Sequence, residues 1–328
     1  MPKAPLPFAR MRDRLRLPLI AAPMFLVSGV DLVTAACRNG VVGSFPTANC
    51  RTTEELSHWL ATIGQTLRSY EETTGTAAAP FCPNLIVHAS NPRLNEDLAI
   101  VCASAPHLVI TSVGSPAPVI APLHDAGAFV LADVATLRHA ERAVAAGADG
   151  LVLLTAGAGG QTGWLNPFAF VRAVRQFFSG PIVLAGGISD GQALHAAIAL
   201  GCDLAYMGTR FIATEESMAP QGYKEMVVAA SADDIILTRA FTGLQTNMLR
   251  PSIIAAGLDP EALPERGMID IAKDISVEGR EQRSKRWRDI WSAGHSASGA
   301  SEILSVAALV AQTEAQYHAT QSAAQRTG

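Results

Sequence analysis

The sequence has few charged and few aromatic residues, and it contains no long uninterrupted apolar run. Charged residues occupy 16% of the 328 positions and aromatic residues 6%, whereas about 25% charged residues is usual for soluble domains. Acidic residues outnumber basic ones, 29 to 25, so no basic surplus supports a nucleic-acid partner. No segment approaches the ~20 apolar residues of a membrane span. With 49% hydrophobic residues, the sequence predicts a core-rich globular protein with a small-molecule substrate and no membrane partner.

Residue pairs that hold metals or form disulfide frameworks are also missing. The five cysteines are far apart and include no C-x-x-C, and the eight histidines include no H-x-x-x-H or H-x-H pair. The sequence has no G-x-S-x-G nucleophile elbow either. We therefore expect free thiols, no catalytic metal and a reducing, cytoplasmic location.

The basic N-terminus precedes an apolar stretch, as it does in a secretory signal peptide. The basic stretch is long, however, and Pro18 and Pro23 interrupt the apolar run. These features favour a buried first strand over a signal peptide.

Short apolar runs alternate with helical patterns through the first two-thirds of the chain. None of the runs alternates between polar and apolar residues, which is typical of parallel strands buried on both faces. Eight such units in succession, with no G-x-G-x-x-G after the first, predict a (β/α)8 barrel rather than an open Rossmann sheet. The predicted strands are Leu17–Ala22, Val41–Ser44, Phe81–Val87, Leu108–Val113, Phe129–Asp133, Leu151–Thr155, Ile182–Ala185 and Leu204–Met207.

The pattern changes after the eighth predicted strand. Residues 1–214 are expected to form the main part of the barrel, and the irregular segment 215–288 a lid or substrate-side insertion. Residues 289–328 are expected to close on the barrel, with a helix from about 301 to 319 and a frayed end.

Active sites of such barrels lie on the loops that follow the strands. Gly186-Gly187 follows the seventh predicted strand and Met207-Gly208-Thr209 ends the eighth. Glycines let a backbone approach a phosphate, and a helix start offers it N–H groups. These loops predict a phosphate site, although each glycine alone also fits a tight turn.

Two further strand ends carry candidate groups. The small-residue run 155–164 could let a flat ligand lie on the backbone or could form a surface loop. Asn84 is a polar residue in an apolar strand and needs a hydrogen-bond partner, either a ligand or a neighbouring backbone. His88 would sit at the rim of the barrel, as a base or as a solvated side chain.

Taken together, these motifs resemble the nitronate monooxygenase (nitropropane dioxygenase) family and its flavin-barrel relatives, the enoyl-acyl carrier protein reductases and quinone reductases. The resemblance covers nearly the whole chain and is most specific in AGGISDG and YMGTRF. It implies an FMN-binding barrel. In such a barrel Ala22, Pro23 and Met24 would line the flavin ring, Asn84 would bond it, and Gly159-Gly160 would pass over its face. Gly186-Gly187 and Met207-Gly208-Thr209 would hold the phosphate, in agreement with the phosphate site predicted above.

Two residues depart from the family pattern. In most members the A-G-G run is followed by a histidine that removes the α-proton of a nitroalkane, whereas this chain has Gln161. An amide cannot act as a general base at neutral pH, so His88 or His295 would have to substitute. Asp133 stands near the flavin where many relatives have a polar or cationic residue. Trp164 could wall the substrate space or simply pack.

The leading functional hypothesis is an FMN oxidoreductase that oxidises alkyl nitronates with O₂ and turns over neutral nitroalkanes weakly. The alternative is an NAD(P)H-dependent flavin reductase of an enoyl thioester, a quinone or a similar acceptor. A flavin-free phosphate-binding isomerase or lyase and a catalytically inactive flavin-binding paralogue are further hypotheses. A homodimer is compatible with the apolar composition.

Overall fold

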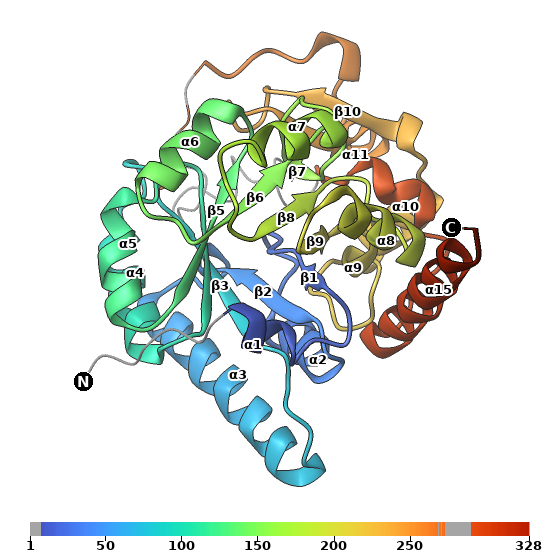
Figure 1. Ribbon diagram of the computed structural model, residues 1–328. Helices are drawn as coiled ribbons and strands as arrows, with labels where there is room; N and C mark the ends of the chain where they lie inside the picture. Colours follow the sequence, from blue (N-terminus) through green and yellow to red (C-terminus); the bar gives the residue numbers. More distant parts are fainter. Residues whose placement is uncertain (1–7, 268, 270, 273–289, 328) are drawn as a thin grey trace.

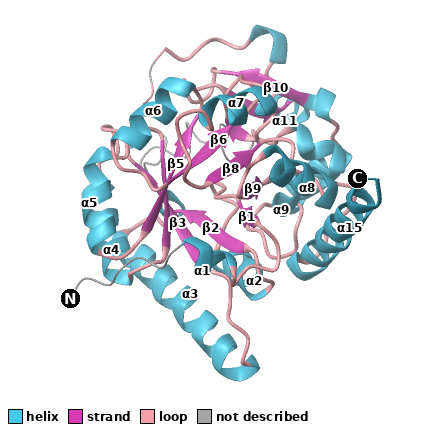
Figure 2. Ribbon diagram, in the orientation of Figure 1, coloured by secondary structure: helices cyan, strands magenta, loops and turns pink. Residues whose placement is uncertain are grey.

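Eight parallel strands close into a barrel whose outside is covered by helices (Figures 1 and 2). The computed structural model describes residues 8–267, 269, 271–272 and 290–327. Strand β1 (Leu19–Ala21) pairs with both β2 (Val42–Pro46) and β9 (Leu204–Met207), which closes the ring. The predicted (β/α)8 barrel is confirmed.

All eight predicted strands are present, with ends that differ by at most two residues. The first is the buried N-terminal strand β1, all three residues of which are enclosed. The remaining barrel strands are β3 (Phe81–Ile86), β4 (Leu108–Ser112), β5 (Phe129–Val134), β6 (Gly150–Leu154) and β8 (Ile182–Ala185).

Helices follow the strands and pack their apolar sides against the barrel. Side-chain caps start several of them as their sequences predict: Thr52 accepts from the Glu55 N–H at 3.2 Å, and Thr136 from the His139 N–H at 3.1 Å. The helices of the barrel region are α1 (Phe8–Arg12), α2 (Val30–Arg38), α3 (Thr53–Thr74), α4 (Leu94–Ser104), α5 (Ala117–Asp125), α6 (Leu137–Ala145), α7 (Pro167–Val174), α8 (Gly191–Leu200) and α9 (Thr209–Ile212), with the 3-10 turn η1 (Thr47–Asn49).

The strands bury both of their faces, which explains why none of them alternates between polar and apolar residues. Inward side chains such as Ile20, Leu131 and Val183 fill the barrel. Outward side chains such as Leu19, Val130 and Leu184 pack beneath the helices. The interior is therefore a packed core, and space for a ligand remains only at the barrel's end.

The segment after α9 is more regular than predicted. It contains α10 (Gln221–Ala229), α11 (Arg250–Ala255), the 3-10 turns η2 (Ala232–Asp234) and η3 (Pro260–Ala262), and a hairpin of β10 (Ile235–Thr238) and β11 (Thr246–Leu249). These elements are too short for a hydrophobic period to reveal them. The charged run 278–289 lies outside the described residues, and the divisions at 214 and 288 stay predictions.

The C-terminal helix α15 (Val306–Thr327) packs against α8 and α2 (Figure 1). It starts later than predicted because the Glu216 carboxylate accepts from the Val306 N–H, and the Ser305 hydroxyl from the Ala308 N–H. It also extends to Thr327, beyond the end predicted at about residue 319. The Gln- and Ala-rich end consists of good helix formers. Among the described residues, no helix combines the length and apolarity that a membrane span requires.

Candidate active site

One cavity of about 230 Å³ opens at the carboxyl ends of the barrel strands. Residues from all eight barrel strands or the loops that follow them line it, as do residues of the later segment. Among the described residues, the side chains that line the cavity include no lysine, arginine or histidine. The residues that carry the argument below are Ala22, Pro23, Met24, Asn84, Ser112, Asp133, Gly159, Gly160, Gln161, Gly186, Gly187, Tyr206, Gly208, Thr209 and Tyr223.

The floor of the cavity holds three polar side chains with enclosed atoms that lack partners. The atoms are Asn84 Nδ2, Asp133 Oδ1 and the Tyr206 hydroxyl, none of which has a hydrogen bond to a described residue. The other amide atom of Asn84, Oδ1, accepts from the Ser112 hydroxyl at 3.2 Å, which fixes the orientation of the amide. Because buried polar groups are normally paired, these atoms point to a ligand with polar edges.

Burial shifts the ionisation of two floor residues. It raises the pKa of Asp133 to about 8 and holds the pKa of Tyr206 well above its ordinary value, with a smaller contribution from the Asp133 charge. Desolvation disfavours a charged carboxylate. At neutral pH both groups are therefore mainly neutral, and each carries an O–H that can donate.

Glycines form the rim of the cavity where side chains would not fit. Gly186 has a φ of +124°, and a Cβ there would lie 2.5 Å from Thr155 Oγ1. At Gly187, with a φ of +76°, a Cβ would meet no atom within 4 Å, so its absence keeps space open beside the backbone. The two predicted phosphate loops thus come together at the rim through Gly186-Gly187 and Gly208-Thr209.

The start of α8 does not serve this rim as predicted. Its first N–H groups already have partners inside the protein: Asp190 Oδ1 accepts from Ala193 at 2.8 Å, and Gln316 Oε1 accepts from Gly191 at 3.1 Å. The short helix α9, which begins at Thr209 beside the cavity, has no side-chain cap. The backbone of Gly186-Gly187 therefore forms this part of the rim, and the first N–H groups of α8 are not available to it.

A hairpin from the later segment fixes the glycine-rich loop that carries Gln161. Strand β7 (Gly160–Gln161) pairs with β11, Gln161 opposite Thr246, in an antiparallel sheet ordered β10-β11-β7. Buried Asn247 donates from Nδ2 to the Ala158 carbonyl at 2.7 Å. Gln161 lines the cavity, and no hydrogen bond to a described residue engages its amide. The side chain is free to contact a substrate.

The sequence model of the family described as nitronate monooxygenase matches residues 10–315, nearly the whole chain. The chain belongs to the nitronate monooxygenase family. It is therefore an oxidoreductase enzyme, as the motifs predicted.

Individual relatives agree with the family. A nitronate monooxygenase of Paraburkholderia phytofirmans is 28% identical over 298 residues, 78% of this chain and 80% of the relative. A (3aS,4S,5R,7aS)-5-hydroxy-7a-methyl-1-oxo-octahydro-1H-indene-4-carboxyl-CoA dehydrogenase of Mycobacterium tuberculosis is 25% identical over 240 residues, 72% of this chain and 64% of the relative.

Solved structures show the same barrel fold. FabK from Thermotoga maritima superimposes with a TM-score of 0.80 at 24% identity, covering 97% of this chain and 99% of its own. A nitroalkane oxidase from Streptomyces ansochromogenes gives 0.77 at 24% identity, covering 95% and 99%.

The segment Ala22–Met24, which lines the cavity, is held by residues that sequence reasoning missed. Asn49 donates from Nδ2 to the Met24 carbonyl at 3.0 Å and accepts from the Leu26 N–H at 2.9 Å. The Ser28 hydroxyl accepts from the Met24 N–H at 3.0 Å. Leu26 has a φ of +59°, a strained value that these bonds maintain. Only the polar character of buried Asn49 could have signalled its role.

The later segment contributes one wall of the cavity. Tyr223 lines it, stacks on Trp291 at 4.9 Å between ring centroids, and donates its hydroxyl to the Ser292 carbonyl. Thr242, Leu244 and Ser296 also line the wall. Residues of this segment therefore form part of the cavity, and the lid or substrate-side insertion expected over 215–288 stays a prediction.

Four predicted residues lie outside the cavity lining. His88 bonds Ser90 through Nδ1 at 2.8 Å, and His295 is exposed behind Gly157. The Met207 side chain is buried under the helices, so only its backbone faces the rim. Trp164 is 73% exposed and does not wall the substrate space. Of the predicted catalytic residues, the structure brings only Gln161 to the cavity.

Proposed function

We propose that the protein is an FMN-dependent enzyme that oxidises alkyl nitronates with O₂. The observation that carries the proposal is the cavity itself. Three enclosed, unpartnered polar atoms lie on its floor, and its rim includes Gly159 and Gly186, where a Cβ would be crowded, and Gly187, where space is open. This arrangement fits a flat ring with polar edges and a phosphate tail. When bound, such a flavin supplies the electron acceptor for the nitronate and the electron donor for O₂.

The chain's own residues would hold this cofactor in a defined way. Ala22, Pro23 and Met24 would line the ring, and Asn84 would bond its edge through Nδ2. Gly159 and Gly160 would pass over its face. The backbones of Gly186-Gly187 and Met207-Gly208-Thr209 would hold the phosphate.

Gln161 determines which substrates such an enzyme can oxidise, because nitronates and neutral nitroalkanes differ in their need for a base. A neutral nitroalkane must lose its α-proton before it can be oxidised. The described residues that line the cavity include no lysine or histidine, and their one carboxyl group, that of Asp133, is mainly protonated at neutral pH because burial raises its pKa to about 8. A nitronate has already lost that proton. The Gln161 amide can donate a hydrogen bond to a nitronate oxygen but cannot remove a proton, so nitronate oxidation survives and nitroalkane turnover is weak.

A second candidate function is reduction of an enoyl thioester, quinone or similar acceptor with NAD(P)H. The Gln161 amide, which has no hydrogen bond to a described residue, favours this second function, because a neutral hydrogen-bond donor suffices to polarise a substrate carbonyl. The carboxyl-CoA dehydrogenase of Mycobacterium tuberculosis, which is 25% identical to this chain, acts by its name on a CoA compound, and this likeness also supports an acyl-thioester substrate.

Oxygen consumption by the purified protein tests the two functions against each other. We expect consumption with propyl nitronate, a much lower rate with freshly dissolved neutral nitropropane, and no dependence on NADH or NADPH. Equal rates with both nitro compounds, once spontaneous ionisation is subtracted, would contradict the assignment to Gln161. Turnover only with NAD(P)H and an enoyl thioester or quinone would establish the second function instead.

A further inference from the structure

Asp133 is the one aspartate, glutamate, lysine, arginine or histidine among the described residues that line the cavity. Nothing in the proposed reaction uses it. It lies near the end of β5, two residues after the inward-facing Leu131, so its side chain enters the barrel from the same face. Its Oδ1 is enclosed and has no hydrogen bond to a described residue.

The described groups that face Asp133 offer no counter-charge. Tyr206 from β9 and Cys82 from β3 are the titratable groups whose ionisation its charge affects, and both are neutral at pH 7. Asn84 from β3 and Ser112 from β4 line the same cavity and are uncharged. A carboxylate in this position would be desolvated and unpaired, which is costly. Burial accordingly raises the pKa of Asp133 from its ordinary value of 3.8 to about 8.

The polar side chains on the floor of the cavity can therefore all act as hydrogen-bond donors. Asn84 presents Nδ2, Tyr206 presents its hydroxyl, and Asp133 presents an O–H when it carries its proton. Carbonyl oxygens and unprotonated ring nitrogens, which the edge of a flavin ring carries, are acceptors. A protonated Asp133 complements such an edge, whereas a carboxylate would place negative charge against its lone pairs.

We infer that Asp133 works as a neutral carboxylic acid whose O–H donates a hydrogen bond to the ring edge of the bound flavin, so that loss of this proton weakens cofactor binding. The inference rests on the proposed flavin cofactor. It makes Asp133 a cofactor-positioning residue rather than a base for the substrate.

Titration of the flavin-free protein with FMN at a series of pH values tests this inference without any turnover. If only the protonated form binds, affinity falls about tenfold between pH 7 and pH 9, because one proton must be taken up. Asp133→Asn keeps a neutral donor at every pH and should bind FMN with an affinity that varies less than about twofold over this range. Riboflavin, which lacks the phosphate, should show the same difference between the two proteins.

His139→Gln is the matched control, since His139 is an exposed titratable residue on the helix that follows β5. It should keep the wild-type pH profile. Parallel profiles for wild type and Asp133→Asn would overturn the inference while leaving the cofactor in place. Failure of wild type to bind FMN at any pH would overturn both the inference and the proposed function.

Infrared spectroscopy of the wild-type protein gives a second readout should Asp133→Asn not fold. A protonated carboxyl band should persist at pH 7 and shift when FMN binds. Absence of that band at pH 7 would overturn the inference.

Discussion

Gln161 lines the cavity, and the backbone pairing of β7 with β11 sets its position. Its amide has no hydrogen bond to a described residue. We propose that it stands where the family's usual histidine would reach the substrate, so that the protein accepts only substrates that arrive already deprotonated, or carbonyl compounds that need only a hydrogen bond.

Replacing Gln161 with histidine should restore general base catalysis. We expect Gln161→His to raise kcat/KM for neutral nitropropane by at least about tenfold, within the usual range for a positioned base. The value for propyl nitronate should change little. Gln161→Asn, which shortens the amide without adding a base, is the control. An equal gain on both substrates would show that the residue does not act on the α-proton.

Asp133 should make the flavin-free protein less stable as pH rises. Its folded pKa of about 8 lies above the ordinary value of 3.8, so the folded state holds a proton that the unfolded state releases in this range. Its unfavourable contribution therefore grows from about pH 4 to pH 8 and then levels off. Asp133→Asn removes it.

Thermal unfolding measures this effect directly. The Tm of Asp133→Asn should exceed that of wild type by at least about 2 °C at pH 8, and by less at pH 5. A Tm difference that is constant from pH 5 to pH 8 would mean that Asp133 is ionised in the folded protein.

At the scale of elements, the active-site loop depends on a hairpin more than 70 residues away in the sequence. Asn247 on β11 is 3% exposed and its donation to the Ala158 carbonyl bridges the two segments. Asn247→Ala should cost about 1–3 kcal/mol because it leaves a buried acceptor unpaired, and it should weaken FMN binding. Leu237→Ser on β10, where the leucine is 50% exposed, is the control and should change neither Tm nor affinity. If Asn247→Ala bound FMN with unaltered affinity, the hairpin would have no role in positioning the cofactor site.

The glycine turn after β8 can be tested with two alanine variants. Gly186 and Gly201 both have positive φ values, +124° and +107°, but only at Gly186 would a Cβ meet other atoms. Gly201→Ala should cost about 1–2 kcal/mol for the left-handed conformation alone. Gly186→Ala should cost more and should also lower FMN affinity. Equal Tm losses with equal affinities would show that crowding at Gly186 has no role in the site.

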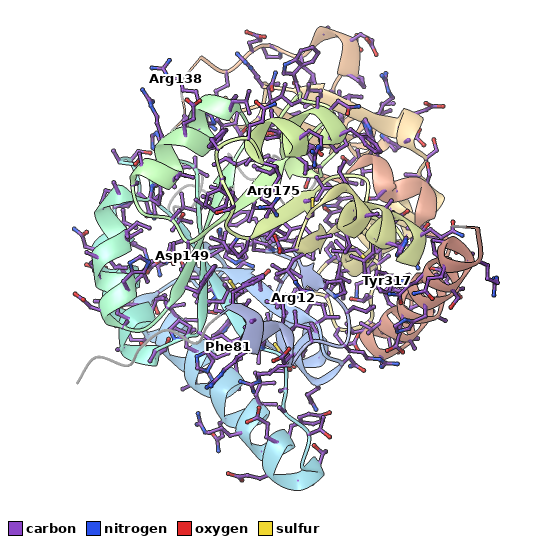
Figure 3. All side chains as sticks on the ribbon, in the orientation of Figure 1. Arg12, Phe81, Arg138, Asp149, Arg175 and Tyr317 are labelled. Atoms are coloured by element: carbon purple, nitrogen blue, oxygen red, sulfur yellow. The ribbon has the colours of Figure 1, made fainter. Side chains whose placement is uncertain are left out.

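At the scale of the whole molecule, the last helix holds the barrel together by burial more than by charge. On α15, Val310 is fully buried, whereas Glu314 forms a partly exposed ion pair with Arg16. Tyr317, labelled in Figure 3, contributes an edge-on contact with His195 at 5.6 Å between ring centroids. At the amino ends of the barrel strands, Asp203, which directly precedes β9, forms ion pairs with Arg175 and Arg12. Figure 3 labels the two arginines.

Two substitutions on α15 separate these contributions. Val310→Ala should destabilise the protein by about 2 kcal/mol through lost burial and a cavity. Glu314→Gln should cost no more than about 1 kcal/mol, as is usual for exposed ion pairs. Urea unfolding of both variants measures the difference. A larger loss of unfolding free energy for Glu314→Gln than for Val310→Ala would show that the ion pair, rather than burial, holds α15 against the barrel.

The strands of the barrel could be predicted because each is a local apolar run bounded by clear turns. The cavity-lining residues Ala22–Met24 and the glycine turns could also be predicted, since they follow strands directly. The hairpin contact of Asn247, the buried support of Asn49 and the bond of Gln316 to the start of α8 could not, because each depends on partners distant in sequence. The placement of His88 and His295 outside the cavity likewise follows from tertiary packing.

The central claim is that this family member oxidises nitronates on a flavin without a histidine base. Its most direct test is the visible spectrum of the purified protein under anaerobic conditions, before and after addition of propyl nitronate. The account predicts a flavin absorption band that the nitronate bleaches or converts to a radical form. A flavin band that propyl nitronate leaves unchanged would contradict it.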